Sequence, residues 1–148
     1  MTAPSPSVSE TLTFRLGVLG ALATARFTER LDALALKPKH VGLLALLDAG
    51  APASQLELAR TMGVAPSLMV TLADHLGELG AVGRERDPAD RRRQVLTLTD
   101  HGRELLAGAA RAASELDEEL AASLTPARRT ALDRALRDLA EAEGMPVT

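Results

Sequence analysis

SQLELARTMGVAPSLMVTLADHLGELG, residues 54–80, is the stretch that decides the fold. Ser54 is a good N-cap, and Glu57 follows it by three positions, so the pattern predicts a capped helix over residues 55–62. The Gly63-Val64-Ala65 run predicts a tight turn, and Pro66 suits the first position of a helix that continues to about residue 79. Two short helices joined by a glycine-containing turn form a helix-turn-helix.

A β-hairpin is predicted directly after this motif. Residues 82–86 and 94–99 have the pattern of short extended strands, and the polar segment 87–93 is the loop between them. A hairpin in this place is a wing. The predicted fold class is therefore mainly α with a small β-hairpin wing, a winged helix-turn-helix.

Longer helices flank the predicted lobe. A helix over about residues 11–34 would be about 36 Å long at ~1.5 Å per residue, which is longer than a compact monomer of this size needs. Pro38 can open a helix that reaches Leu47, Thr99 can cap a helix from Asp100 to about Leu120, and Thr125-Pro126 can open a last helix that ends near Gly144. We therefore expect a flexible tail (1–10), a first helix that is a candidate for pairing with another subunit, and a winged helix-turn-helix lobe (36–99).

The composition excludes several classes of protein. The 148 residues suit one domain, and 46% are apolar but only 1% aromatic, so the core must be built from leucine, alanine, valine and methionine at helical spacing. The chain has no cysteine, which excludes disulfides, thiolate catalysis and cysteine-ligated zinc. Residues 1–10 lack the features of a signal peptide, and no stretch of eighteen apolar residues follows, so we expect a cytoplasmic protein without membrane contact.

Charge is distributed unevenly along the chain. The formal net charge is −3, yet the segment from Arg84 to Arg93 holds five arginines against three acidic residues. From Glu104 to the end, nine acidic residues outnumber five arginines. One short basic segment with an acidic remote end is typical of a protein that presents a small face to phosphate.

Four motifs carry a resemblance to a known family. They are Leu58-Ala59-Arg60 with Gly63-Val64, the run LGELGAV at residues 76–82, the run RDPADRR at residues 86–92, and the run LTLTDHG at residues 96–102. In this order and spacing they resemble the MarR (multiple antibiotic resistance regulator) family, by motif over roughly residues 36–106. The resemblance implies a six-helix architecture and a dimer in which the first and last two helices interlock, so that residues 11–35 and 100–148 are dimerisation helices and the lobe of residues 36–99 binds DNA. It also implies repression of nearby genes that is relieved by a small, often phenolic, ligand. The peroxide-sensing branch of the family needs a cysteine that this chain lacks.

The second helix of the motif is expected to lie in the major groove with its N-terminal end toward the bases. Hydroxyl groups there can bind phosphates or bases, and apolar side chains can contact thymine methyl groups. The candidate contacts of the helix-turn-helix are Ser54, Pro66, Ser67, Met69, Val70, Thr71 and His75. Members of the family often have arginine where this chain has Thr71 and His75, which favours apolar and indirect readout here. The alternative for Met69, Leu72 and Leu76 is that they belong to the core.

The wing offers a second set of contacts. Arg91 and Arg92 at the loop tip can enter a minor groove, and Asp90 can pair with one guanidinium and fix its direction. Arg84, Arg86 and Arg93 are candidates for contacts with the DNA backbone. The alternative is that this run of arginines is only a solvated surface.

Evidence for other sites is weaker. In the family, effectors bind between the dimer helices and the DNA-binding lobe, and the candidate lining residues here are Arg15, Arg26, Lys39, His40 and Leu43. Arg26 and Lys39 could equally be solvated, and His40 could be a packed or helix-capping histidine. The three histidines have no metal-ligand spacing, and the sequence lacks catalytic and phosphate-binding motifs, so we expect no metal, no cofactor and no enzyme activity.

Two functions are compatible with these features. The first is a transcriptional repressor that binds a palindromic operator in double-stranded DNA as a homodimer and responds to a small effector, such as an aromatic acid. The second is a winged-helix module for protein-protein interaction that has lost specific DNA readout. Thr71 and His75 in place of arginines support the second, and the arginine-rich wing argues against it.

Overall fold

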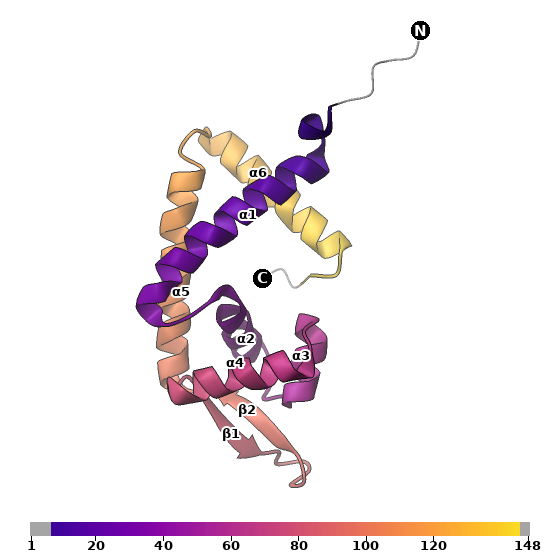
Figure 1. Ribbon diagram of the computed structural model, residues 1–148, viewed down its shortest axis with the longest axis vertical. Coiled ribbons are helices and arrows are strands. Elements are labelled where there is room, and N and C mark those ends of the chain that lie inside the picture. Colours follow the sequence, from indigo (N-terminus) through magenta and orange to yellow (C-terminus); the bar gives the residue numbers. More distant parts are fainter. Residues whose placement is uncertain (1–6, 146–148) are drawn as a thin grey trace. The chain divides into compact units, whose positions relative to one another are not determined.

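The computed structural model describes residues 7–145. The chain divides into two compact units, Met1–Ala113 and Ser114–Thr148. The elements labelled in Figure 1 are α1 (Leu12–Leu31), α2 (Pro38–Ala49), α3 (Gln55–Met62), α4 (Pro66–Glu78), β1 (Val82–Arg86), β2 (Gln94–Leu98), α5 (Asp100–Leu120) and α6 (Pro126–Ala142). The prediction of a mainly helical fold with a two-stranded wing is confirmed. Within the described residues, every helix is too short or too polar to cross a membrane.

The helix-turn-helix forms as the capping residues predict. The Ser54 hydroxyl accepts a hydrogen bond from the Glu57 backbone N–H at 3.3 Å, and the Glu57 carboxylate accepts one from the Ser54 N–H at 2.9 Å. Gly63 ends α3 in the left-handed region with φ of 63°, where a side chain would be strained, and Pro66 opens α4. These residues determine where α3 begins and ends and where α4 begins.

The wing is an antiparallel hairpin that extends away from the helix-turn-helix in Figure 1. Its register runs from the pair Val82 and Leu98 to the pair Arg86 and Gln94. The Leu96 N–H also donates to the Ala53 carbonyl at 2.8 Å, which attaches β2 to the segment before α3. The middle of β2 is therefore bonded to the residue that precedes the N-cap of α3.

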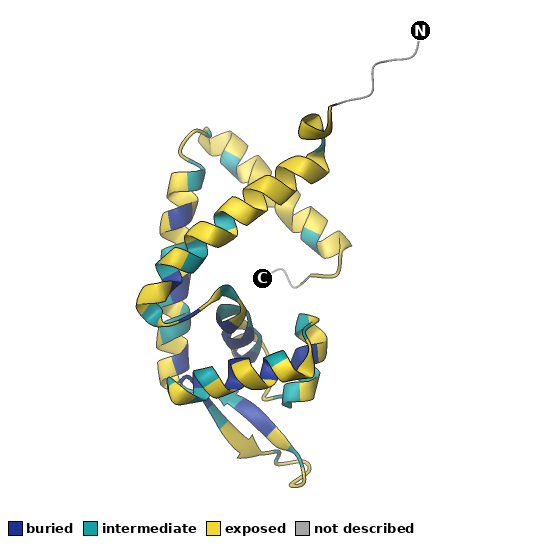
Figure 2. Cartoon of the chain, viewed as in Figure 1, coloured by how far each residue is buried: buried dark blue, intermediate teal, exposed yellow. Residues whose placement is uncertain are grey.

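The core lies among α2, α3, α4 and the base of the wing (Figure 2). Aliphatic side chains supply it, as the scarcity of aromatic residues requires, and burial of each leucine contributes about 2 kcal/mol. The buried members are Leu31, Leu36, Leu43, Leu44, Leu47, Leu58, Ala59, Met69, Leu72, Ala73, Leu76, Ala81, Val82, Leu96 and Ala109. The alternative that Met69, Leu72 and Leu76 are core residues is therefore confirmed.

The start of α5 packs closely against the turn that follows α4. The Thr99 hydroxyl donates to the Gly80 carbonyl at 2.6 Å and accepts from the Gly102 N–H at 3.0 Å, so it caps the helix as predicted. A β-carbon at Gly102 would lie 2.1 Å from the Ala81 carbonyl oxygen. Only glycine fits at this point of α5.

The N-terminal region differs from its prediction in two places. The tail is predicted over residues 1–10, but Val8–Glu10 form a 3-10 turn (η1), in which the Ser7 N–H donates to the Glu10 carboxylate at 2.9 Å; residues 1–6 lie outside the described part. The first helix is predicted to reach residue 34, but its last turn is a 3-10 turn, Asp32–Leu34 (η2). Ala35 then takes a left-handed conformation with φ of 54°, which ends the helix sharply.

Much of the apolar surface of α1 is exposed. Leu12, Phe14, Leu16, Val18, Leu19 and Leu22 are all exposed, and Figure 2 shows exposed residues along most of this helix. In the second unit, Thr125 caps α6 by accepting a hydrogen bond from the Arg128 N–H, and Arg129 pairs with Glu118 at 2.8 Å. Leu132, Leu136 and Leu139 of α6 are also exposed.

Candidate functional site

The N-terminal turns of α4 present a small exposed surface. Pro66, Ser67 and Val70, which are predicted to contact DNA, are exposed there. Met69 is also predicted to contact a base, but its side chain is completely buried in the core and cannot reach one. The exposed end of α4 therefore offers the Ser67 hydroxyl and the branched apolar side chain of Val70, with the hydroxyl of the exposed Thr71 next to them.

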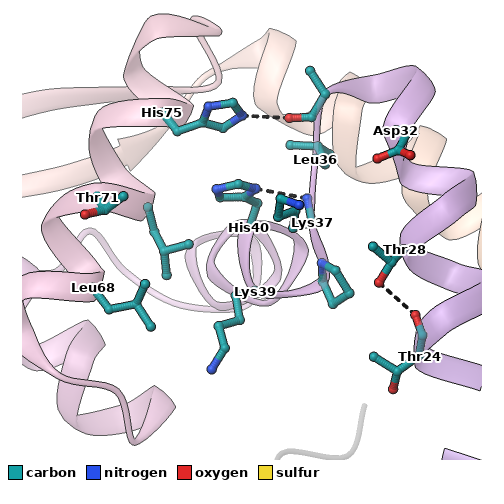
Figure 3. A pocket seen from close by; sticks show the side chains of 13 residues that line it. Thr24, Thr28, Asp32, Leu36, Lys37, Lys39, His40, Leu68, Thr71 and His75 are labelled. Atoms are coloured by element: carbon teal, nitrogen blue, oxygen red, sulfur yellow. Dashed lines mark hydrogen bonds between the residues drawn. The ribbon is translucent and has the colours of Figure 1, made fainter. Parts of the chain in front are cut away.

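Thr71 and His75 of α4 line a cavity rather than only an outer surface (Figure 3). The Thr71 hydroxyl donates to the Ser67 carbonyl of its own helix at 3.2 Å. Nε2 of His75 is 2.6 Å from the Ala35 carbonyl oxygen, and its ring stacks on that of His40. The predicted DNA contact of His75 is thus corrected, because its imidazole is engaged inside the protein.

Three of the five wing arginines are bonded within the protein. Arg84 pairs with Asp74 of α4 at 2.5 Å, and Arg86 donates to the Arg91 carbonyl at 2.8 Å. Arg93 pairs with Glu57 of α3, and its Nε lies 3.6 Å from Asp87 Oδ2. The sequence predicts contacts of Arg84, Arg86 and Arg93 with the DNA backbone and carries no signal for these internal partners, which lie up to 36 positions away.

The tip of the wing differs from its base. The side chains of Arg91 and Arg92 are exposed and have no ion pair or hydrogen bond with any described residue. The Asp90 carboxylate accepts a hydrogen bond from the Arg92 backbone N–H at 3.0 Å, which shapes the turn. The prediction that Asp90 pairs with a guanidinium is therefore corrected: it fixes the backbone of the tip instead.

Ser54 and Glu57 are hydrogen-bonded to each other in the N-terminal cap of α3, so their polar atoms are not free for DNA. The Ser54 hydroxyl is engaged in the cap of α3 and is half-buried. The Ser54 N–H that donates to the Glu57 carboxylate, together with the Arg93 guanidinium, holds the pKa of Glu57 below its ordinary value. Glu57 is therefore a stable anion at the junction of α3 and the wing.

The cavity has a volume of about 720 Å³ and lies between the end of α1, the start of α2 and α4. Its lining consists of Thr24, Thr28, Asp32, Ala35, Leu36, Lys37, Pro38, Lys39, His40, Leu68, Thr71, Leu72 and His75. Lys39 and His40 are predicted from the sequence. Leu43 is instead fully buried in the core, and the exposed Arg15 and Arg26 are not part of the lining.

His40 forms the inner wall of this cavity (Figure 3). Its Nδ1 accepts a hydrogen bond from the Lys37 N–H at 2.9 Å, so the ring caps α2 in the way that the alternative interpretation predicts. Its ring lies 4.4 Å from that of His75 at an interplanar angle of 19°. Burial, and then the nearby His75 and Lys37, lower the pKa of His40 from its ordinary value of 6.5.

The lining chemistry suits an anionic ligand with an apolar body. Lys37 and Lys39 outnumber the one acidic residue of the lining, Asp32, and leucine and proline side chains supply the apolar surface. No sequence pattern indicates the pairing of His40 and His75, which lie on different helices. The only sequence signal for Thr24 and Thr28 is that they are two polar residues one helical turn apart on the first helix. Among residues 7–145, no group of histidine and acidic side chains is arranged to hold a metal ion.

Comparison with known proteins identifies the family. The sequence pattern of the MarR family matches residues 36–93, which include the helix-turn-helix and the wing loop. The transcriptional regulator HosA of Escherichia coli O111:H- is 34% identical over 105 residues, which cover 69% of this chain and 74% of that protein. The chain belongs to the MarR family. It is a DNA-binding transcriptional regulator and not an enzyme.

Solved structures of MarR-family proteins have the same fold over nearly the whole chain. The repressor CouR bound to a 23-mer DNA duplex is 31% identical, with a TM-score of 0.78 over 95% of this chain and 99% of that one. CouR from Rhodococcus jostii RHA1 bound to p-coumaroyl-CoA is 26% identical, with a TM-score of 0.79 over 97% of this chain and 99% of that one. Relatives with this fold therefore bind a DNA duplex and a small molecule with an aromatic group.

Proposed function

We propose that this MarR-family protein represses transcription as a homodimer on a palindromic operator and that a small aromatic acid releases it. The observation that carries the proposal is that α4 has an exposed N-terminal end and also forms part of the cavity wall. Ser67 and Val70 are exposed near its N-terminal end, while Leu68 and His75 form one wall of the cavity. A molecule in the cavity would therefore lie against the helix that is proposed to enter the major groove.

DNA recognition would combine the exposed end of α4 with the wing tip. Ser67 can bind a phosphate or base edge, and Val70 can contact a thymine methyl group. Arg91 and Arg92 are exposed cations without a partner among residues 7–145, and their place at the end of a hairpin suits a narrow minor groove with its concentrated negative potential. With few polar side chains on α4 for base readout, DNA shape should contribute a large share of the specificity.

Dimerisation is supported by the exposed apolar residues of α1. Val18 and Leu19 are 54% and 60% exposed, and an apolar surface of this kind is usually covered by a partner. A two-fold axis would place two lobes on one face of the DNA, with half-sites about 10 base pairs apart.

The ligand is proposed to be an aromatic carboxylic acid or a thioester of one. Lys39 supplies a cation for the anionic group, and Leu36, Leu68 and Leu72 supply apolar surface for the ring. The likeness to CouR, which binds p-coumaroyl-CoA, supports the same class of ligand.

Fluorescence anisotropy tests the DNA-binding half. A labelled duplex from the region upstream of the gene should bind about a thousand-fold or more tightly than random DNA at physiological salt. The comparison is made at two salt concentrations, because non-specific binding depends strongly on salt. A specificity ratio near one would instead favour a winged-helix module without sequence readout.

A thermal-shift screen tests the ligand half. A bound acid should raise the melting temperature of the native protein by mass action, and Lys39→Ala should reduce the rise at equal ligand concentration. Lys39 is exposed, so the variant should fold, and the screen then measures the difference between two folded proteins. No response to benzoate, p-coumarate or p-coumaroyl-CoA would contradict this half of the proposal.

A further inference from the structure

We propose that His75 transmits the state of the cavity to α4, because a ligand carboxylate competes with the Ala35 carbonyl for the hydrogen on His75 Nε2. This inference rests on the proposed function, since it concerns how a ligand in that cavity changes DNA binding. It assigns to His75 of α4 a coupling role, in which its Nε2–H donates either to Ala35 or to the ligand, and this role is separate from any contact with DNA.

His75 is hydrogen-bonded to the backbone of Ala35. A carbonyl oxygen can only accept a hydrogen bond, so Nε2 of His75 must carry the hydrogen in the 2.6 Å contact. Ala35 lies in the left-handed conformation between η2 and the start of α2. The bond therefore attaches the last turns of α4 to the junction of α1 and α2, 40 positions earlier in the sequence.

The His75 ring rests on that of His40. His40 accepts the Lys37 N–H through Nδ1, so α2 holds its ring in one orientation. The His75 ring stacks on it at 4.4 Å, nearly parallel, and Figure 3 shows both rings at the edge of the same cavity. The stack covers one face of the His75 ring, while its Nε2 points to Ala35.

A ligand carboxylate is a stronger acceptor than the Ala35 carbonyl. Hydrogen bonds to an ionised carboxylate are about twice as strong as those to a neutral carbonyl. Lys37 and Lys39 line the same cavity and Asp32 is the acidic residue in the lining, so the cavity has an excess of positive charge that favours a carboxylate. When a carboxylate accepts the hydrogen bond from His75 Nε2–H in place of the Ala35 carbonyl, α4 loses its attachment to Ala35. The ligand then favours an arrangement of α4 that differs from the DNA-bound one, as any effector must to shift the equilibrium.

Separate measurements of binding and coupling test the role of His75. Affinity for the operator is measured with and without saturating p-coumarate, and affinity for p-coumarate is measured by calorimetry. In the unaltered protein the acid should weaken DNA binding by roughly 5- to 150-fold, the usual range of such coupling. His75→Phe keeps a ring for the stack but has no hydrogen to donate, so it should bind p-coumarate more weakly. At p-coumarate concentrations that saturate the variant, the change in DNA affinity should fall below about twofold.

Two further variants complete the test. His75→Gln keeps an N–H donor and should retain most of the coupling. His101→Phe is the matched control, because His101 is an exposed histidine whose partner is Glu104 of the same helix, and it should behave as the unaltered protein. A measurement on the unaltered protein does not depend on any variant: the Nε2–H resonance of His75 should shift when p-coumarate is added.

The outcomes are distinguishable. If the unaltered protein binds no aromatic acid, the ligand half of the proposed function fails, and this inference fails with it. If p-coumarate weakens DNA binding equally in the unaltered protein and in His75→Phe, the inference alone is overturned. It is also overturned if the His75 resonance does not move at saturation, or if His75→Phe binds p-coumarate as tightly as the unaltered protein.

Discussion

The guanidinium of Arg93 on the wing contacts the carboxylate of Glu57 in the first turn of α3. Glu57 is held in place by the Ser54 N–H, and Arg93 also lies near Asp87 at the start of the wing loop. A charged residue in an arginine-rich wing is thus used to attach the hairpin to the helix-turn-helix. In the proposed DNA complex, the placement of the wing tip relative to α4 would depend in part on this contact.

Arg93→Ala is expected to weaken operator binding without changing its salt dependence. Arg93 positions the wing and neutralises a carboxylate, so its loss releases no additional counterion from DNA. Glu57→Gln should have a similar effect, and the double variant should be no worse than the stronger single one. Anisotropy titrations at several salt concentrations measure both quantities. A reduced salt slope for Arg93→Ala would show that Arg93 contacts phosphate after all.

Arg92→Ala is expected to weaken operator binding strongly and to lower the magnitude of the salt slope by about one. Its side chain is exposed and unpaired within the described residues, so nothing in that part of the protein competes with DNA for it. The melting temperature should stay the same, since no internal bond is lost. Equal affinity of the variant and the unaltered protein across the salt titration would contradict the assignment of Arg92.

The fold was predictable because local signals decide it. Ser54, Glu57, Gly63 and Pro66 act on neighbours within a few positions, and the structure places α3 and α4 where those residues predict. The site was less predictable because its contacts are remote in sequence. No periodicity indicates that Arg93 meets Glu57 or that His75 meets Ala35, since each pair forms only after the helices pack.

Met69 shows that sequence patterns are also insufficient to place a side chain within a single helix. Its position in the first turns of α4 is compatible with a base contact, and only the packing of α3 and α4 turns it into the core. Leu72 and Leu76 continue the same apolar stripe and are also core residues, as the alternative interpretation predicts. An apolar stripe on a helix therefore predicts that the stripe is buried, but not where its boundary with the exposed face falls.

Stability is expected to fall as the pH drops below neutrality, because of His40. Burial, His75 and Lys37 lower its pKa in the folded protein below the ordinary value of 6.5. Between the two pKa values the unfolded chain binds the proton more readily, so acidification favours unfolding there. His40→Gln can accept the Lys37 N–H without titrating and should flatten this dependence. Melting temperatures at several pH values from about 7.5 to about 5.5 provide the check, and equal slopes for both proteins would rule out His40 as the cause.

Gly102→Ala is expected to destabilise the fold by about 1–3 kcal/mol, the usual cost of forcing an atom into a packed site. The new β-carbon would lie 2.1 Å from the Ala81 carbonyl oxygen, which belongs to the backbone and cannot move alone. Gly42→Ala on α2 is the matched control, because among the described residues a β-carbon there would meet only the flexible end of the Met62 side chain, at an ordinary 3.5 Å. That control should be neutral or slightly stabilising, since alanine favours helix. Denaturant unfolding measures both, and equal stability of the two variants would contradict the close packing at α5.

Leu19→Asp is expected to convert the protein to monomers and to weaken operator binding with it. Leu19 is 60% exposed on α1, among apolar neighbours that a second subunit would cover. A charge at the centre of a covered apolar surface must be desolvated without a partner, which opposes association. Ala45→Asp, on the exposed face of α2, places the same charge outside this surface and should leave the mass unchanged. Light scattering gives the molar mass, and anisotropy with full and half operators gives the affinity. If Leu19→Asp remained dimeric and bound the full operator normally, α1 would not be the dimer interface, and the paired lobes would need another two-fold contact.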